Sequence, residues 1–168
     1  VEKLGFFVNI GKWQLKRLGL HVDQLDISTA SCETMQSTLA KNEFIYITGG
    51  NTFYLLQELK RTGADQLIVQ EVNRGKIYIG ESAGAIVAAP DIAYAAAMDH
   101  VEKAPGLHDY TGLHLIDFYV VPHDQNWEFK NAVEKIREDY SGNIDLKMIN
   151  DKQAIRVEND IVQVLGKM

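Results

Sequence analysis

The chain has 168 residues, which is enough for one domain with its own hydrophobic core. Its formal net charge is −6 and no Lys/Arg cluster is longer than a pair, so binding to nucleic acid or to an anionic membrane surface is not expected. The single Cys32 excludes an internal disulfide and is typical of a reducing compartment. No apolar run approaches membrane-spanning length and the first residues do not read as a signal peptide, so we expect a cytoplasmic protein.

The first half of the chain predicts helices that alternate with strands. In chain order we expect a helix at residues 2–18, a strand at 21–27, a helix at 31–40, a strand at 44–47 and helices at 53–62 and 65–73. Ser31 is a suitable N-cap for the second helix, and Gly63 is a suitable stop for the third. The dense apolar run Phe44-Ile45-Tyr46-Ile47 is typical of a strand buried on both faces, as parallel strands are.

The second half continues this alternation and ends in a hairpin. We expect a strand at residues 77–79, a short helix at 85–89, an irregular stretch at 91–115, a strand at 118–121, a helix at 127–140 and hairpin strands at 154–157 and 161–164. The pattern predicts one α/β domain over residues 1–168, built on a mainly parallel, doubly wound sheet. Such a sheet normally opens on a strand, whereas this chain opens on a helix. We therefore expect the N-terminal strand of the sheet to be missing from this chain.

The stretch from residue 77 to residue 89 has the strand–turn–helix arrangement of a nucleophile elbow. Its turn reads Gly80-Glu81-Ser82-Ala83-Gly84, which is a Gly-x-Ser-x-Gly motif. Glycine fits where a sharp turn presses the backbone against its neighbours, and Ser82 is then held at the tip, beside the N-terminus of the next helix. The alternative is a Gly/Ser-rich turn without chemistry, which the flanking strand and helix disfavour.

A nucleophilic serine needs a base and an oxyanion hole. Of the five histidines, only His123 directly follows a strongly predicted strand, where a catalytic group would be held rigidly. The N–H group of Ala83 follows the nucleophile, and a second donor would come from the Gly-rich strand end Gly49-Gly50-Asn51. A phosphate cradle is the competing interpretation of these glycines, but GxxxxGK[ST] and GxGxxG are both absent.

The acid that would orient the histidine has two candidates. Asp99 lies between the serine and the histidine in sequence, and Asp151 lies after the histidine, so the residues alone leave the choice open. No HExxH, no CxxC and no histidine pair at helical spacing occurs, and we expect no metal site. The scattered histidines of the irregular stretch are rejected as metal ligands: His100, His108 and His114.

Three segments in this order closely resemble the peptidase E family of serine peptidases, to which aspartyl dipeptidase is related: residues 48–52 (TGGNT), residues 78–85 (YIGESAGA) and Pro122-His123. The resemblance extends over nearly the whole chain. It implies a flavodoxin-like sheet akin to that of class I glutamine amidotransferases, and no cofactor. It also implies functional roles for four residues: Ser82 as nucleophile, His123 as base, and the N–H groups of Gly50 and Ala83 as the oxyanion hole.

The resemblance also bears on the third catalytic residue. The family's acid has been placed at an Asp downstream of the serine, near Asp99 here, or near the C-terminal hairpin, where Asp151 stands in place of the family's Glu. We prefer Asp151, because it precedes a strand that can dock beside the sheet.

The expected function is a serine exopeptidase or dipeptidase that hydrolyses short peptides, with Asp-X dipeptides as candidate substrates. Aspartyl dipeptidase has an aromatic residue before its serine, whereas Glu81 in this chain would repel an acidic side chain or attract a free amino terminus. The predicted substrate-binding residues are Gly49, Asn51 and Glu81. The alternatives are a catalytically inactive binding module on the same fold and an amidase for a non-peptide amide. We expect the protein to be a monomer or a homodimer.

Overall fold

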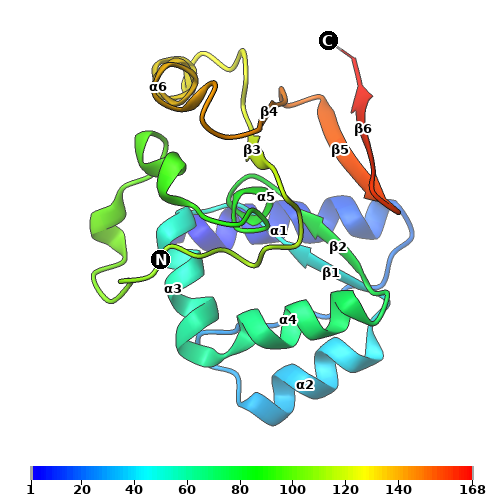
Figure 1. The fold of residues 1–168 in the computed structure, drawn as a ribbon. Coiled ribbons are helices and arrows are strands. Elements are labelled where there is room, and N and C mark those ends of the chain that lie inside the picture. Colours follow the sequence, from blue (N-terminus) through cyan, green and yellow to red (C-terminus); the bar gives the residue numbers. More distant parts are fainter. Residues whose placement is uncertain (1, 168) are drawn as a thin grey trace.

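The computed structural model describes residues 2–167, and it describes side-chain surroundings from residue 8 onward (Figure 1). The helices are α1 (Glu2–Arg17), α2 (Cys32–Lys41), α3 (Thr52–Thr62), α4 (Ala64–Asn73), α5 (Ala83–Ile86) and α6 (Lys130–Tyr140), with short 3₁₀ helices η1 (Ala93–Ala97) and η2 (Val101–Lys103). The strands are β1 (Phe44–Ile47), β2 (Ile77–Gly80), β3 (Tyr119–Val121), β4 (Leu146–Met148), β5 (Gln153–Glu158) and β6 (Ile161–Gly166).

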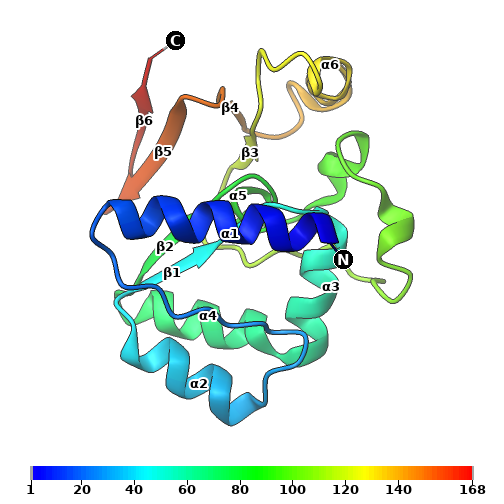
Figure 2. The same cartoon turned by 180° about the vertical axis from the view of Figure 1, so that it is seen from behind.

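The strands pair in three two-stranded sheets. Strands β1 and β2 are parallel, β3 and β4 are parallel, and β5 and β6 form an antiparallel hairpin. Helix α1 lies across β1 and β2, and helices α2 and α4 lie side by side (Figures 1 and 2). The α/β class with parallel strands is therefore confirmed. Within the described residues these pairs are not joined into one continuous sheet.

Residues 21–27 were expected to form a strand, and that prediction is wrong. The segment is irregular and no strand among the described residues pairs with it. A strand needs a neighbour that accepts its N–H groups and donates to its carbonyl groups. Apolar alternation without such a neighbour does not suffice to form a strand.

The β1–β2 pair is buried on one face only, which corrects the expectation for residues 44–47. Ile45 is buried, whereas Phe44, Ile77 and Ile79 are 40%, 55% and 37% exposed. Helix α1 reaches this sheet where Gly11 lies against the Tyr46 ring, since a Cβ at Gly11 would be 3.2 Å from the Tyr46 hydroxyl. The helix thus leaves part of an apolar face uncovered.

Two predicted helix boundaries are confirmed by their local chemistry. At the start of α2, Ser31 Oγ accepts a hydrogen bond from the Thr34 N–H at 3.1 Å, as an N-cap does. At the end of α3, Gly63 adopts a φ of 73°, a left-handed conformation that glycine tolerates without strain.

Helix α5 is shorter than the expected 85–89 and ends at Ile86. The carbonyl groups that follow it are used by another segment: the Val87 oxygen accepts from the Leu113 N–H at 2.7 Å, and the Ala88 oxygen accepts from the Leu115 N–H at 2.8 Å. The irregular stretch therefore pairs with the chain where a longer helix would have continued.

The larger of two hydrophobic clusters among the described residues lies between the helices and strands that carry the site. Its fully buried members include Phe53, Leu56, Leu59, Ile86, Ile92, Val121 and Ile136. The buried Tyr94 hydroxyl donates to the Val120 carbonyl at 2.6 Å and so ties η1 to β3. The predicted C-terminal hairpin is confirmed, and every residue of its second strand is exposed. Among the described residues, the helices are too short or too polar to span a membrane.

Candidate active site

The turn between β2 and α5 has the geometry of a nucleophile elbow. Ser82 adopts φ 52° and ψ −112°, a combination that few non-glycine residues tolerate. The flanking glycines are required by close contacts. A Cβ at Gly80 would lie 2.4 Å from the Gly84 oxygen, and a Cβ at Gly84 would lie 2.2 Å from the Ile47 oxygen. The motif is thus compressed between β1 and its own helix, and Ser82 is presented at the tip.

Ser82, His123 and Asp151 lie in one chain of hydrogen bonds. Ser82 Oγ is 2.9 Å from His123 Nε2, and His123 Nδ1 is 2.7 Å from Asp151 Oδ1. The His123 side chain is 24% exposed, and the Asp151 side chain is 49% exposed. His123 also has a positive φ of 65°, so both the serine and the histidine stand on strained backbone.

Strand β4, which was not among the predicted elements, brings the histidine and the aspartate together. It pairs in parallel with β3, so that Val121 lies opposite Met148. The pairing continues past both strand ends, because the Ile149 N–H donates to the Val121 oxygen and the Asp124 N–H donates to the Ile149 oxygen, both at 3.0 Å. The two loops that follow, with His123 on one and Asp151 on the other, therefore run side by side.

Two further residues contact His123 and Asp151, and neither belongs to a motif in the sequence. Asn126 Nδ2 donates to Asp151 Oδ2 at 2.7 Å, and the Phe129 ring stacks on the His123 ring with centroids 4.4 Å apart. Burial alone would raise the pKa of Asp151, but hydrogen bonds from His123 and Asn126 outweigh it and hold that pKa below its ordinary value. Asp151 is therefore an ionised acceptor near neutral pH.

Of the predicted oxyanion donors, Ala83 directly follows Ser82 in the chain, and Gly50 directly follows Gly49. Gly49 packs directly against Ser82, since a Cβ on Gly49 would be 3.2 Å from Ser82 Cβ. Among the described residues, the N–H groups of Gly50 and Ala83 donate to no backbone acceptor. The Asn51 side chain is used locally instead, because its Oδ1 accepts from the Tyr54 N–H at 2.9 Å and caps α3.

Glu81 lies in the same cleft as Ser82 and is exposed. Its carboxylate accepts a hydrogen bond from the Tyr46 hydroxyl. Burial, and then this contact with Glu81, raise the pKa of Tyr46 well above its ordinary range, so the phenol stays protonated and remains a donor. No Lys, Arg or His side chain from residue 8 onward forms an ion pair with Glu81.

The second candidate acid lies elsewhere. Asp99 Oδ2 accepts hydrogen bonds from the N–H group and the hydroxyl of Thr52, and Asp151 already occupies His123 Nδ1.

The remaining histidines are also apart from the serine. His114 Nε2, for example, is 3.0 Å from Asp117 Oδ1 on the surface. Within the part of the chain that the structure describes, no three His, Cys, Asp or Glu side chains form a metal-binding group.

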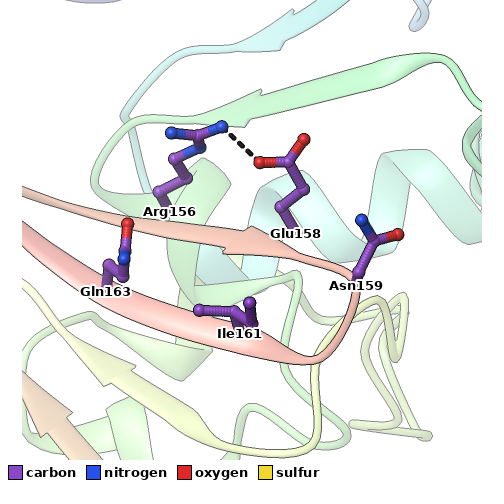
Figure 3. Close-up of a pocket in the computed structure, with 5 residues that line it drawn as sticks. All are labelled: Arg156, Glu158, Asn159, Ile161 and Gln163. Atoms are coloured by element: carbon purple, nitrogen blue, oxygen red, sulfur yellow. Dashed lines mark hydrogen bonds and ion pairs between the residues drawn. The ribbon is translucent and has the colours of Figure 1, made fainter.

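The site opens into a cleft of about 1390 Å³. One wall comes from the β2 edge and the Gly-rich turns, and the other from β3, the β4–β5 loop and the hairpin. A second hollow, of about 180 Å³, lies at the hairpin tip and is lined by Arg156, Glu158, Asn159, Ile161 and Gln163 (Figure 3). In this second hollow, Arg156 and Glu158 form an ion pair with each other, and none of its lining residues is a predicted site residue. The larger cleft is therefore the candidate active site.

The chain is similar to several known peptidases. The chain is 49% identical to an uncharacterised peptidase from Listeria innocua over 96% of this chain and 78% of that protein. It is 35% identical to a peptidase E from Salmonella arizonae over 67% of this chain and 45% of that protein. A crystal structure of a candidate peptidase E protein from Listeria monocytogenes superposes with a TM-score of 0.91 at 47% identity, covering 97% of this chain and 79% of that one.

The chain spans about four-fifths of the length of the most similar of these relatives. A family model matches residues 1–165, from the first helix into the last strand of the hairpin, and it is described as Peptidase family S51. The match covers both Gly-rich turns and the loop that carries His123. The chain therefore belongs to peptidase family S51.

Proposed function

We propose that this chain is a serine exopeptidase of the dipeptidase type that hydrolyses short peptides. In this proposal Ser82 is the nucleophile, His123 is the general base and Asp151 is the acid that orients it. The proposal rests on the hydrogen-bond chain from Ser82 Oγ through both ring nitrogens of His123 to Asp151, at 2.9 and 2.7 Å. Membership of a peptidase family supports peptide bond hydrolysis as the reaction.

In the first half of the reaction, Ser82 Oγ attacks the scissile carbonyl carbon while its proton passes to His123 Nε2. The carbonyl bond electrons move to the oxygen, which becomes an oxyanion that accepts hydrogen bonds from the Gly50 and Ala83 N–H groups. The imidazolium then gives the proton to the leaving amine as the C–N bond breaks, and an ester remains on Ser82. A water molecule, deprotonated by His123, hydrolyses the ester and restores the serine.

The role of Asp151 follows from its bonds. An ionised carboxylate at His123 Nδ1 keeps that nitrogen protonated, so Nε2 is the free base that faces Ser82. The carboxylate also stabilises the imidazolium formed when the serine proton is transferred. Asn126 fixes the second carboxylate oxygen, and this keeps the first one aimed at the histidine.

A short peptide with a free amino terminus is the substrate class that the cleft favours. Glu81 is an exposed carboxylate next to the nucleophile, oriented by Tyr46 and without a cationic partner among the side chains described. It would attract an α-ammonium group and disfavour an acidic side chain at the same place. Asp-X dipeptides are the first to test, because the motif segments resemble the peptidase E family, to which aspartyl dipeptidase is related.

The substrate proposal is tested with Glu81→Gln, which keeps the shape and removes the charge. We expect KM for a dipeptide with a free amino terminus to rise about tenfold, because a charge-assisted hydrogen bond is weakened. For the N-acetylated dipeptide, KM should be unchanged. An equal rise in KM for both substrates would contradict the role of Glu81.

Active-site labelling tests the catalytic proposal. A fluorophosphonate probe reacts only with an activated serine, and mass spectrometry locates the label. We expect the label on Ser82, no label in Ser82→Ala or His123→Ala, and a fall of about six orders of magnitude in kcat for Ser82→Ala. His114→Ala is the matched control, since His114 also contacts an aspartate but no serine. A folded parent that takes no label would favour an inactive binding module, whereas a labelled protein that cleaves only non-peptide amides would favour an amidase.

The flavodoxin-like, doubly wound sheet also stands as a proposal. Both β1–β2 and β3–β4 are parallel pairs, and β2 and β3 both border the cleft. One further parallel strand between β2 and β3 would join the pairs into a single sheet. An experimental structure in which β2 and β3 lie in separate sheets, with no strand from any part of the protein between them, would contradict the proposal.

A further inference from the structure

We propose that Asp99 is a positioning residue that holds the Gly49–Gly50 turn, and with it the Gly50 N–H group, beside Ser82. The inference rests on the proposed function, since it assigns a role in the same oxyanion hole. Asp99 Oδ2 accepts a hydrogen bond from the Thr52 N–H at 2.9 Å and a second from the Thr52 hydroxyl at 2.5 Å. Thr52 is fully buried, so both of its polar groups depend on this carboxylate.

A second contact strengthens the same connection. Asn51 Nδ2 donates to the His100 carbonyl at 3.0 Å, while Asn51 Oδ1 accepts from the Tyr54 N–H at 2.9 Å. Residues 99 and 100 of the irregular stretch therefore bind residues 51 and 52 at the start of α3. A carboxylate at this helix N-terminus also interacts favourably with the unpaired N–H groups there.

The start of α3 is connected to the catalytic serine by a very short path. Thr52 follows the Gly-rich turn directly, and Gly49 packs against Ser82, with ideal-Cβ distances of 3.2 Å to Ser82 Cβ and 3.6 Å to Ser82 Oγ. Gly50 has a φ of 149°, which few other residues could adopt. Glycine backbone is intrinsically mobile, so the position of the Gly50 N–H group depends on its neighbours. Asp99 anchors Thr52, which lies two residues after Gly50.

This role differs from that of a triad acid. The only ring nitrogen of His123 not facing Ser82 is occupied by Asp151 Oδ1 at 2.7 Å. An acid that acted on the histidine would change how activity depends on pH. An acid that positions an oxyanion donor would change the stabilisation of the tetrahedral oxyanion, and would leave the pH dependence and ground-state binding alone.

The test uses Asp99→Ala and Asp99→Asn, with Asp91→Ala as the matched control. Asp91 lies in the same stretch and its Oδ1 accepts from the Ala93 N–H at 2.7 Å, but it has no bond to α3. A peptide aldehyde, which forms an oxyanion on the serine, reports on the hole, and the corresponding peptide alcohol reports on ground-state binding. For Asp99→Ala we expect kcat and aldehyde affinity to fall about 10²-fold, with KM, alcohol affinity and the pH profile of kcat/KM unchanged.

Asp99→Asn keeps an oxygen acceptor for Thr52, so it should recover most of the lost activity, to within about tenfold of the parent. Asp91→Ala should lower Tm without changing aldehyde affinity. A shift of the pH profile in Asp99→Asn, or an equal loss of aldehyde and alcohol affinity in Asp99→Ala, would overturn the proposal.

A measurement without substrate separates this proposal from the proposed function. In NMR spectra of the parent and the variants, the Gly50 amide resonance should move in Asp99→Ala and stay in place in Asp91→Ala. An unmoved Gly50 resonance in a folded Asp99→Ala variant refutes the positioning role, whatever the activity of the parent. Absence of fluorophosphonate label on the parent refutes the proposed function alone.

Discussion

Replacing Gly84 with alanine would separate the geometry of the elbow from its chemistry. A Cβ at this position would lie 2.2 Å from the carbonyl oxygen of Ile47, whereas ordinary van der Waals contact begins at 3.4 Å. The two backbone segments must therefore separate by about 1.2 Å. Neither segment is free to move, since Ile47 pairs with Gly80 in the sheet and its oxygen accepts the Glu81 N–H at 2.9 Å.

The displacement falls on both halves of the site. Ile47 ends the strand that leads into the Gly49–Gly50 turn, and Gly84 is two residues after Ser82. A misplacement of about 1 Å in a catalytic group costs on the order of 10² in rate. Overpacking a close backbone contact costs about 1–3 kcal/mol of unfolding free energy. We therefore expect the fluorophosphonate labelling rate of Gly84→Ala to fall about 10²-fold, together with a lower Tm.

Gly106→Ala is the matched control for this prediction. A Cβ at Gly106 would meet only the end of the Gln57 side chain, at 3.2 Å, and this flexible side chain can give by a few tenths of an ångström while it still accepts the Gly106 N–H. This variant should keep the parent's labelling rate and a Tm close to the parent's. If Gly84→Ala labelled at the parent's rate, the reasoning that the elbow is compressed against β1 would be refuted.

Three further predictions concern the acid beside the histidine. Asp151→Asn removes the charged acceptor at His123 Nδ1, and we expect kcat to fall about 10³-fold. The loss is smaller than for a fully buried aspartate because water reaches the Asp151 side chain. An unchanged kcat would exclude Asp151 as the orienting acid. Asn126→Ala removes one of the two side-chain hydrogen bonds to the Asp151 carboxylate, and kcat/KM should fall about fivefold to tenfold in steady-state assays. A loss as large as that of Asp151→Asn would mean that Asn126 contacts the reacting groups directly. The pKa of Asp151 is lowered in the folded state, so its ionised form contributes stability above its unfolded pKa, and this contribution is lost as pH falls through the lower folded pKa. The difference in Tm between the parent and Asp151→Asn should therefore be constant above about pH 5 and decrease below about pH 4. A difference that stays constant to about pH 2 would contradict this assignment.

Local constraints made the elbow predictable from the sequence. A Cβ at Gly80 would meet the Gly84 oxygen at 2.4 Å, so the first glycine of the motif records a steric requirement within the turn itself. The same holds for helix ends. The Ser31 side chain accepts a backbone N–H group of its own turn, and Gly63 adopts the left-handed conformation in which helix α3 ends. A sequence pattern is a good guide wherever the partner of a residue lies within the same turn.

Features that depend on distant partners were not predictable in this way. Residues 21–27 alternate as a strand does, but strand formation depends on a neighbour that the pattern cannot supply. Asn126 and Phe129 carry no motif, and their contacts with Asp151 and His123 arise only once two loops lie side by side. The sequence left two candidate acids, and the structure gives them different partners: Asp151 contacts His123, and Asp99 contacts Thr52.

The register of β3 and β4 is the element on which the histidine–aspartate contact depends. Ile149 is buried beside β3, and its backbone bonds to Val121 and Asp124 set the register up to the loops themselves. A slip of one residue along β4 would move Asp151 by about 3.3 Å, which exceeds the 2.7 Å between Asp151 Oδ1 and His123 Nδ1. It would also turn the Ile149 side chain from the core towards solvent. The burial of one apolar side chain, with no chemistry of its own, thereby fixes the position of the carboxylate.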